Sequence, residues 1–224
     1  MGLQKISFKV PPALWQNFAK QANSLFLSRA PFLNHMIARE TPALVADLGG
    51  RELSVVAKRH ISGMLKRQGA TSVNIEVEQS TAAALNDAVR NCNLVRDAFL
   101  CRLIIFLRGS DVLLKYLEVP RKITGRPFGN GLEDMPSSPL KAMEAVRDDP
   151  LFYIRHHLAE NLLTGIYTAP LPRDLDWAAC FIEDKDILGT KAHKTDQRDT
   201  AELFDLLESA AFAKTPLIKK RLAK

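Results

Sequence analysis

The stretch KISFKV, residues 5–10, decides the fold expected for this sequence, because apolar and polar side chains alternate along it without exception. In a β-strand its apolar side chains share one face: Ile6, Phe8 and Val10. Its polar side chains share the other face: Lys5, Ser7 and Lys9. Pro11-Pro12 ends the strand, since neither residue can donate a hydrogen bond to a neighbouring strand.

Two helices are expected after this strand. The first covers about residues 13–21, where Leu14, Trp15 and Phe18 recur at helical spacing. A break follows at Asn23-Ser24. The second helix runs from Arg29 to about Arg39, and Ser28 suits its N-cap.

The same order of elements is expected a second time, about 67 residues further along the chain. Residues 72–77, SVNIEV, alternate as the first strand does, and helices follow over about residues 81–91 and 96–108. Residues 51–67, between the copies, predict an amphipathic helix. Its basic side carries Lys58, Arg59, Lys66 and Arg67.

Positive charge is concentrated at the start of the chain. The 224 residues carry a net charge of +6, but residues 1–71 alone hold ten Lys and Arg against three acidic residues, a net charge of +7. A concentrated positive field is what a polyanion-binding surface requires.

A six-residue strand needs a partner, and the nearest candidate is the other copy of the same pattern. Two such strands make an antiparallel ribbon whose apolar face lies on four helices, and a two-stranded ribbon fits the major groove of B-DNA. The start of the helix after Ser28 offers backbone N–H groups to a phosphate, and Arg29 adds a positive charge there. The pattern leaves open whether the copies pair within one chain or between two chains.

These residues carry a resemblance. The strand ending at Pro11, the helix after it and Leu27-Ser28-Arg29 at the start of the next helix resemble the ribbon-helix-helix family of DNA-binding regulators, the group of MetJ, Arc and CopG, over about residues 4–40. The resemblance implies that outward strand residues read bases and that the start of the second helix holds the DNA backbone. The readers would be Lys5, Ser7 and Lys9, with Asn74 from the less similar second copy. The phosphate contacts would be Ser28 and Arg29, joined by the basic side chains of residues 51–67.

The expected fold class is therefore mainly α with a short two-stranded antiparallel ribbon, a duplicated ribbon-helix-helix. We expect a first unit over residues 1–45, a basic connecting helix over 46–71 and a degenerate second unit over 72–119. A linker or long loop over 120–139, rich in Pro and Gly, then leads to a mostly helical module over 140–224.

The expected function is sequence-specific binding of double-stranded DNA by a transcriptional regulator of bacterial or mobile-element origin, acting as a homodimer without enzymatic activity or cofactor. An accessory protein of a plasmid relaxosome is the near alternative. For the residues beyond the repeats, three roles are open: oligomerisation, ligand sensing or contact with RNA polymerase. No apolar run reaches membrane-spanning length, and three cysteines without metal-ligand spacing favour a reduced, cytoplasmic, nucleoid-associated location.

Two weaker patterns point elsewhere. Asp176 with Glu183-Asp184-Lys185 imitates a metal-dependent nuclease core, in which carboxylates would hold Mg²⁺. His156 and Glu160 have the spacing of two metal ligands on a helix, but no third ligand accompanies them in the sequence. A third alternative is an interaction module of the antitoxin kind that does not bind DNA.

Overall fold

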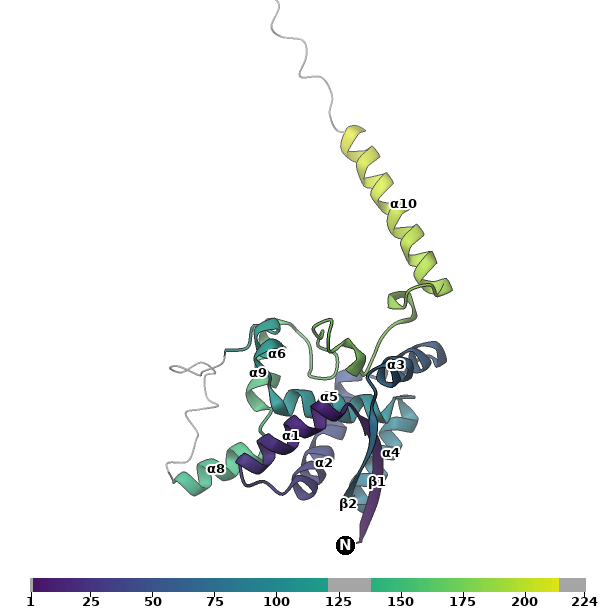
Figure 1. Ribbon diagram of the computed structural model, residues 1–224. Helices are drawn as coiled ribbons and strands as arrows, with labels where there is room; N and C mark the ends of the chain where they lie inside the picture. Colours follow the sequence, from purple (N-terminus) through teal and green to yellow (C-terminus); the bar gives the residue numbers. More distant parts are fainter. Residues whose placement is uncertain (1, 121–137, 214–224) are drawn as a thin grey trace, which may run out of the picture. The chain divides into compact units, whose positions relative to one another are not determined.

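The computed structural model describes residues 2–120 and 138–213, which are mainly helical with one two-stranded antiparallel sheet (Figure 1). The strands are β1 (Leu3–Val10) and β2 (Thr71–Glu78). The helices before residue 121 are α1 (Pro12–Ser24), α2 (Arg29–Leu48), α3 (Val55–Arg67), α4 (Gln79–Asn91), α5 (Arg96–Arg108) and α6 (Asp111–Tyr116). Those after residue 137 are α8 (Pro139–Asp148), α9 (Phe152–Asn161) and α10 (Lys191–Ala213). The expected class, helices with a short antiparallel ribbon, is confirmed.

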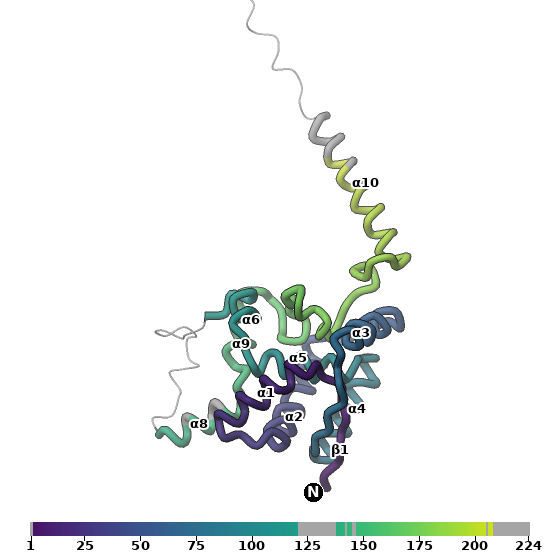
Figure 2. The backbone as a smooth tube through the Cα atoms, in the orientation of Figure 1, coloured from purple at the N-terminus to yellow at the C-terminus, as the bar shows by residue number. Residues whose placement is uncertain are grey.

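The two strands pair within one chain. Leu3 lies opposite Glu78 and Val10 opposite Thr71, so both strands are paired over their whole length. Figure 2 shows the chain running from β1 through three helices before it returns beside β1. The structure thus decides between the two arrangements that the sequence left open.

The inner face of the ribbon belongs to the core. Ile6, Phe8 and Val10 are 4%, 2% and 0% exposed, and Ile75 and Val77 of β2 are also buried. The Phe8 ring meets Trp15 of α1 edge-on, with 6.1 Å between centroids. The alternation of residues 5–10 therefore places the apolar face inward, as expected.

The order strand, helix, helix occurs twice. Helices α1 and α4 each have 13 residues, whereas α2 has 20 residues and α5 has 13. The helices α2 and α5 begin at Arg29 and Arg96, which are 67 positions apart, and the turns before them hold Phe26 and Asn93 in the left-handed region, with φ of 57° and 50°. Helix α2 contacts β2 and α4 of the second segment, and α5 contacts β1 and α1 of the first. The two segments therefore share one core.

Helix α5 is buried on all sides from Ala98 to Phe106, which is typical of a central core helix. It carries one buried cation, Arg102, which donates hydrogen bonds to the backbone carbonyls of Ile166 (2.7 Å) and Ala169. Burial lowers the pKa of this guanidinium. Arg102 thereby holds the segment around residues 166–169 on the core.

A buried carboxylate fastens the same segment to α2. Glu40, 0% exposed, accepts hydrogen bonds from the hydroxyl of Tyr167 (2.8 Å) and the guanidinium of Arg155 on α9 (2.6 Å). Asp47 accepts a bond from the Tyr167 backbone N–H at 2.9 Å. Burial, and then the charge of Glu40, raise the pKa of Tyr167 well above its ordinary 10.0. Residues 151–181 are therefore part of the ribbon-bearing core.

The chain divides into compact units at a different place from the one expected. The units are Met1–Phe181 and Ile182–Lys224, so α8 and α9 belong with the ribbon and not with a module over 140–224. Within the second unit, α10 packs on the short 3-10 turn Asp184–Asp186. The expected linker over 120–139 lies almost wholly outside the described residues.

Two helices differ from the sequence-based predictions by four residues or more at one end. Helix α2 continues past Arg39 to Leu48, because its second half also buries apolar side chains; it includes Pro42. Helix α3 begins only at Val55, after the cap at Ser54. Further along the chain, the 3-10 turn Asp176–Ala178 lies against α3 and α5.

In the described parts of the chain, no helix is both long and apolar enough to cross a membrane. Cys92, Cys101 and Cys180 are all free thiols and all buried. Burial raises the pKa of Cys180 to about 12 from its ordinary 9.0, and Asp47 adds to this while Arg102 opposes it. Burial likewise raises the pKa of Cys101.

Neighbouring residues of β1 should differ sharply in their contribution to stability. Phe8→Ala is expected to lower the free energy of unfolding by about 3–5 kcal/mol, because it empties a buried aromatic site. Lys9→Ala should change it by less than about 0.5 kcal/mol, since Lys9 is exposed. Urea denaturation followed by circular dichroism measures both. The opposite order would mean that the strand presents its other face to the core.

Stability should fall at alkaline pH. Because Cys101 and Cys180 hold their protons in the folded state, their contribution is complete below pH 9 and is lost as pH rises toward 12. Each thiol should contribute a slope of about 1.4 kcal/mol per pH unit within that window. Urea unfolding at pH 8, 9, 10 and 11 measures the slope, and Cys180→Ala should reduce it. An equal slope in wild type and variant would contradict the assignment.

Candidate nucleic-acid interface

The outer face of the ribbon brings together the base-reading residues expected from the sequence. Lys5, Ser7 and Lys9 of β1 are exposed, as are Ser72, Asn74 and Glu76 of β2. These six side chains come from two strands whose alternate residues are buried, so all point away from the core. Apart from Leu3, which lies opposite Glu78 and is 66% exposed, the face is polar.

The register makes this face asymmetric. Lys9 lies opposite Ser72, Ser7 opposite Asn74 and Lys5 opposite Glu76. The hydroxyls of Ser7 and Ser72 are joined diagonally by a hydrogen bond of 2.7 Å. The end of the ribbon with Lys9 therefore carries a net positive charge, while at the other end the charge of Lys5 is offset by its acidic partner across the ribbon.

The start of α2 matches its expected role in position but not in capping chemistry. Ser28 is the N-cap residue, yet its hydroxyl makes no capping hydrogen bond. The Arg29 guanidinium lies over the Trp15 ring, 5.8 Å from its centroid. Both side chains are exposed, so the hydroxyl and the guanidinium lie at a helix N-terminus next to solvent.

Arg96, at the equivalent position on α5, is a residue that the sequence interpretation missed. Its guanidinium donates a hydrogen bond of 2.7 Å to the backbone carbonyl of Ser7, which ties the start of α5 to the middle of β1. Arg96 also lines a cavity of about 310 Å³ together with Lys58 of α3. Its position 67 residues after Arg29, itself a predicted phosphate contact, is the signal that could have identified it.

The four basic residues of α3 divide into two kinds. The Lys58 ammonium is half-buried and donates to the Asn93 side chain (2.8 Å), which in turn donates to the Leu53 carbonyl, so Lys58 joins α3 to the turn before α5. Arg59 is exposed on the same helix. Lys66 and Arg67 are exposed in the last turn of α3, where positive charge complements the helix dipole. They lie four residues before β2 begins.

In each of the two rival patterns, two residues are paired with each other. Lys185 forms an ion pair with Glu183 at 2.8 Å, and this hydrogen bond raises the pKa of the lysine. His156 and Glu160 lie 3.1 Å apart on α9. Within residues 2–120 and 138–213, no three His, Cys, Asp or Glu side chains group so that they could hold a metal ion.

Comparison with known proteins finds no family model, no curated protein and no solved structure that matches the chain. Its geometry is therefore the basis for any functional conclusion.

Two serines at helix starts allow a matched test of the capping geometry. The Ser54 hydroxyl accepts a hydrogen bond from the Ala57 backbone N–H at 2.9 Å, so Ser54→Ala should lower the free energy of unfolding by about 1 kcal/mol. Ser28→Ala should lower the free energy of unfolding by only a few tenths of this amount, because the Ser28 hydroxyl makes no capping hydrogen bond that could be lost. Urea denaturation of both variants checks this, and equal losses would contradict the geometry at Ser28.

Proposed function

We propose that this chain binds double-stranded DNA in a sequence-specific manner, by inserting the β1–β2 ribbon into the major groove, and that it acts as a transcriptional regulator. The observation that carries the proposal is the paired ribbon, whose outer face is polar from Lys5 to Lys9 and whose inner face is apolar and packed. Such a ribbon has the width of the major groove. In that groove lysine can donate hydrogen bonds to the acceptor atoms of guanine, and asparagine can form a pair of hydrogen bonds with adenine.

Charge and helix ends support the same proposal. The excess positive charge of residues 1–71 includes both ribbon lysines and the exposed end of α3. Arg29 at the start of α2 and Arg96 at the start of α5 offer guanidinium groups and helix N-termini for phosphates on either side of the groove.

The two strand–helix–helix segments support a duplicated ribbon-helix-helix within one chain. The equal lengths of α1 and α4, the left-handed turns at Phe26 and Asn93, and the packing of α2 and α5 each on the strand of the other segment are what a fused pair of such units requires. In this proposal one chain provides the complete ribbon, and a homodimer would present two ribbons. A single-chain ribbon also favours the second candidate, an accessory protein at a plasmid transfer origin.

The asymmetry of the ribbon specifies what kind of site it would read. Lysines come only from β1, whereas β2 contributes Asn74 and Glu76. Glu76 suits the amino group of cytosine and disfavours nearby phosphate. One ribbon should therefore recognise a short sequence that is not palindromic.

Selection of bound sequences from random duplex DNA tests the proposal directly. We expect an enriched, non-palindromic motif for each ribbon, with an affinity that falls by orders of magnitude between about 50 and 200 mM salt, because phosphate contacts release counterions. Filter binding or fluorescence anisotropy measures the salt dependence. No enriched motif, or an affinity independent of salt, would refute the proposal.

Lys9 should contribute to specificity and not only to charge. On the selected site Lys9→Ala should weaken binding by about 1–3 kcal/mol, and on random DNA by less, because only the former loses a base contact. The control is Lys20→Ala, which removes an exposed lysine of α1 away from the ribbon. A loss at Lys9 that is equal on both DNAs would make it a phosphate contact.

A further inference from the structure

An apolar cavity lies beside the turn between α1 and α2, whose Leu25 and Leu27 contribute to its lining. Its volume is about 430 Å³, within the range of small-molecule sites. Side chains from α1, α2, α5 and α8 and from the turns beside them line it, among them Phe18, Leu25, Phe32, Leu107, Met143 and Pro150. All of them belong to the first compact unit.

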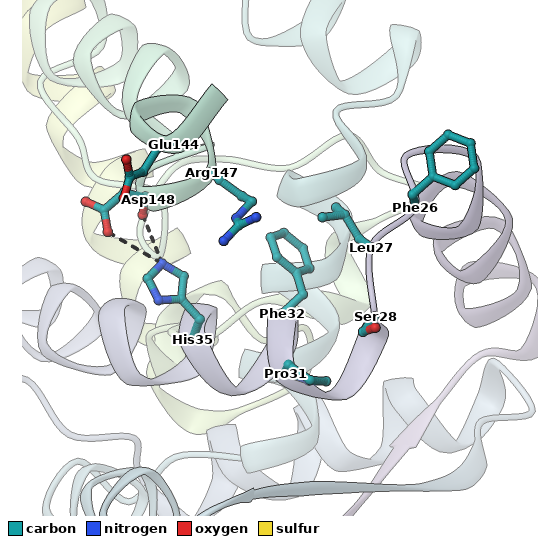
Figure 3. A pocket seen from close by; sticks show the side chains of 9 residues that line it. All are labelled: Phe26, Leu27, Ser28, Pro31, Phe32, His35, Glu144, Arg147 and Asp148. Atoms are coloured by element: carbon teal, nitrogen blue, oxygen red, sulfur yellow. Dashed lines mark hydrogen bonds and ion pairs between the residues drawn. The ribbon is translucent and has the colours of Figure 1, made fainter. Parts of the chain in front are cut away.

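The lining contains one charged side chain, Arg147 near the end of α8. The described residues include no hydrogen-bond or ion-pair partner for its guanidinium. Figure 3 draws a second cavity, of about 490 Å³, and shows Arg147 directed toward Phe32; both residues line both cavities. A cation at the edge of an apolar cavity is a site for an anion attached to a hydrocarbon body.

The acidic neighbours of Arg147 are directed elsewhere. Asp148 binds His35 through its backbone carbonyl, at 3.1 Å, and pairs with Arg39 through its carboxylate, at 3.2 Å (Figure 3). Glu144 lines the second cavity but not the apolar one. Arg147 lines both cavities, and the apolar cavity, unlike the second one, has no acidic side chain in its lining.

Apolar surface beside the cavity is left open to water. Leu25 is 60% exposed and Met143 is 68% exposed, although both contribute to the lining. An occupant with a hydrocarbon body would cover part of both side chains, and removal of that surface from water favours binding. Apart from Arg147, only the Gln21 side chain offers a polar group.

We propose that this cavity binds a small amphipathic anion, a carboxylate with an aliphatic body, whose carboxylate pairs with Arg147. The body lies among the apolar side chains of α1, α5 and α8, and a bidentate guanidinium–carboxylate pair forms at the mouth. The inference is independent of DNA binding, because it uses neither the ribbon nor the exposed lysines.

The proposal is tested by calorimetric titration of the full chain with three ligands that have the same ten-carbon chain and differ in the polar group: decanoate, decanol and decylammonium. Decanoate should bind at one site and about tenfold more tightly than decanol, the difference expected of a charge-assisted hydrogen bond. Decylammonium should bind no better than decanol. Equal affinity for decanoate and decanol, a preference for decylammonium or the absence of saturable binding would each overturn the proposal.

Three variants locate the site. Arg147→Gln should abolish the preference for decanoate and leave decanol binding unchanged. Lys141→Gln removes an exposed charge from the same helix outside the cavity lining, so it should retain the preference. Leu25→Ala should weaken both ligands about threefold, because it removes part of the apolar wall. A preference that survives Arg147→Gln, or affinities unaffected by Leu25→Ala, would place the ligand elsewhere and refute the proposal.

Discussion

The pairing of β1 with β2 inside one chain is the constraint on which the rest of the structure depends. Two strands of eight residues are not stable by themselves in water, and they persist here because Ile6, Phe8, Val10, Ile75 and Val77 are buried on the helices. The helices depend equally on the ribbon, since α2 packs on β2 and α5 packs on β1. Ribbon and helices therefore form one cooperative core.

The two strand–helix–helix segments differ in the turns that precede their second helices. Asn93 tolerates the left-handed backbone well and uses its side chain to hold α3 through Lys58 and Leu53. Phe26 adopts the same conformation, at a cost, with its ring 97% exposed. The turn at Asn93 thus supports α3, while the turn at Phe26 keeps apolar side chains at the surface beside two cavities.

Buried polar groups place the later part of the chain on this core. Glu40 on α2 and Arg102 on α5 both bind the segment that contains Tyr167, and each would be costly to bury without those partners. The same segment carries α9, and Arg155 of α9 also bonds to Glu40. Arg39 of α2 pairs with Asp148 and Asp149 at the end of α8, and this pair of ion pairs holds α8 next to α2.

The sequence alone determined the local elements and the polarity of the ribbon. Strict alternation over residues 5–10 and 72–77 predicted which side chains are buried, because side-chain direction in a strand has a period of two. It also predicted that Lys5, Ser7, Lys9 and Asn74 share one outer face. Only the tertiary structure decided that the copies pair within the chain, that Lys9 faces Ser72 while Lys5 faces Glu76, and that Arg96 binds Ser7. Alternation fixes a face but not a partner, and contacts between residues 65 to 127 positions apart leave no local pattern in the sequence.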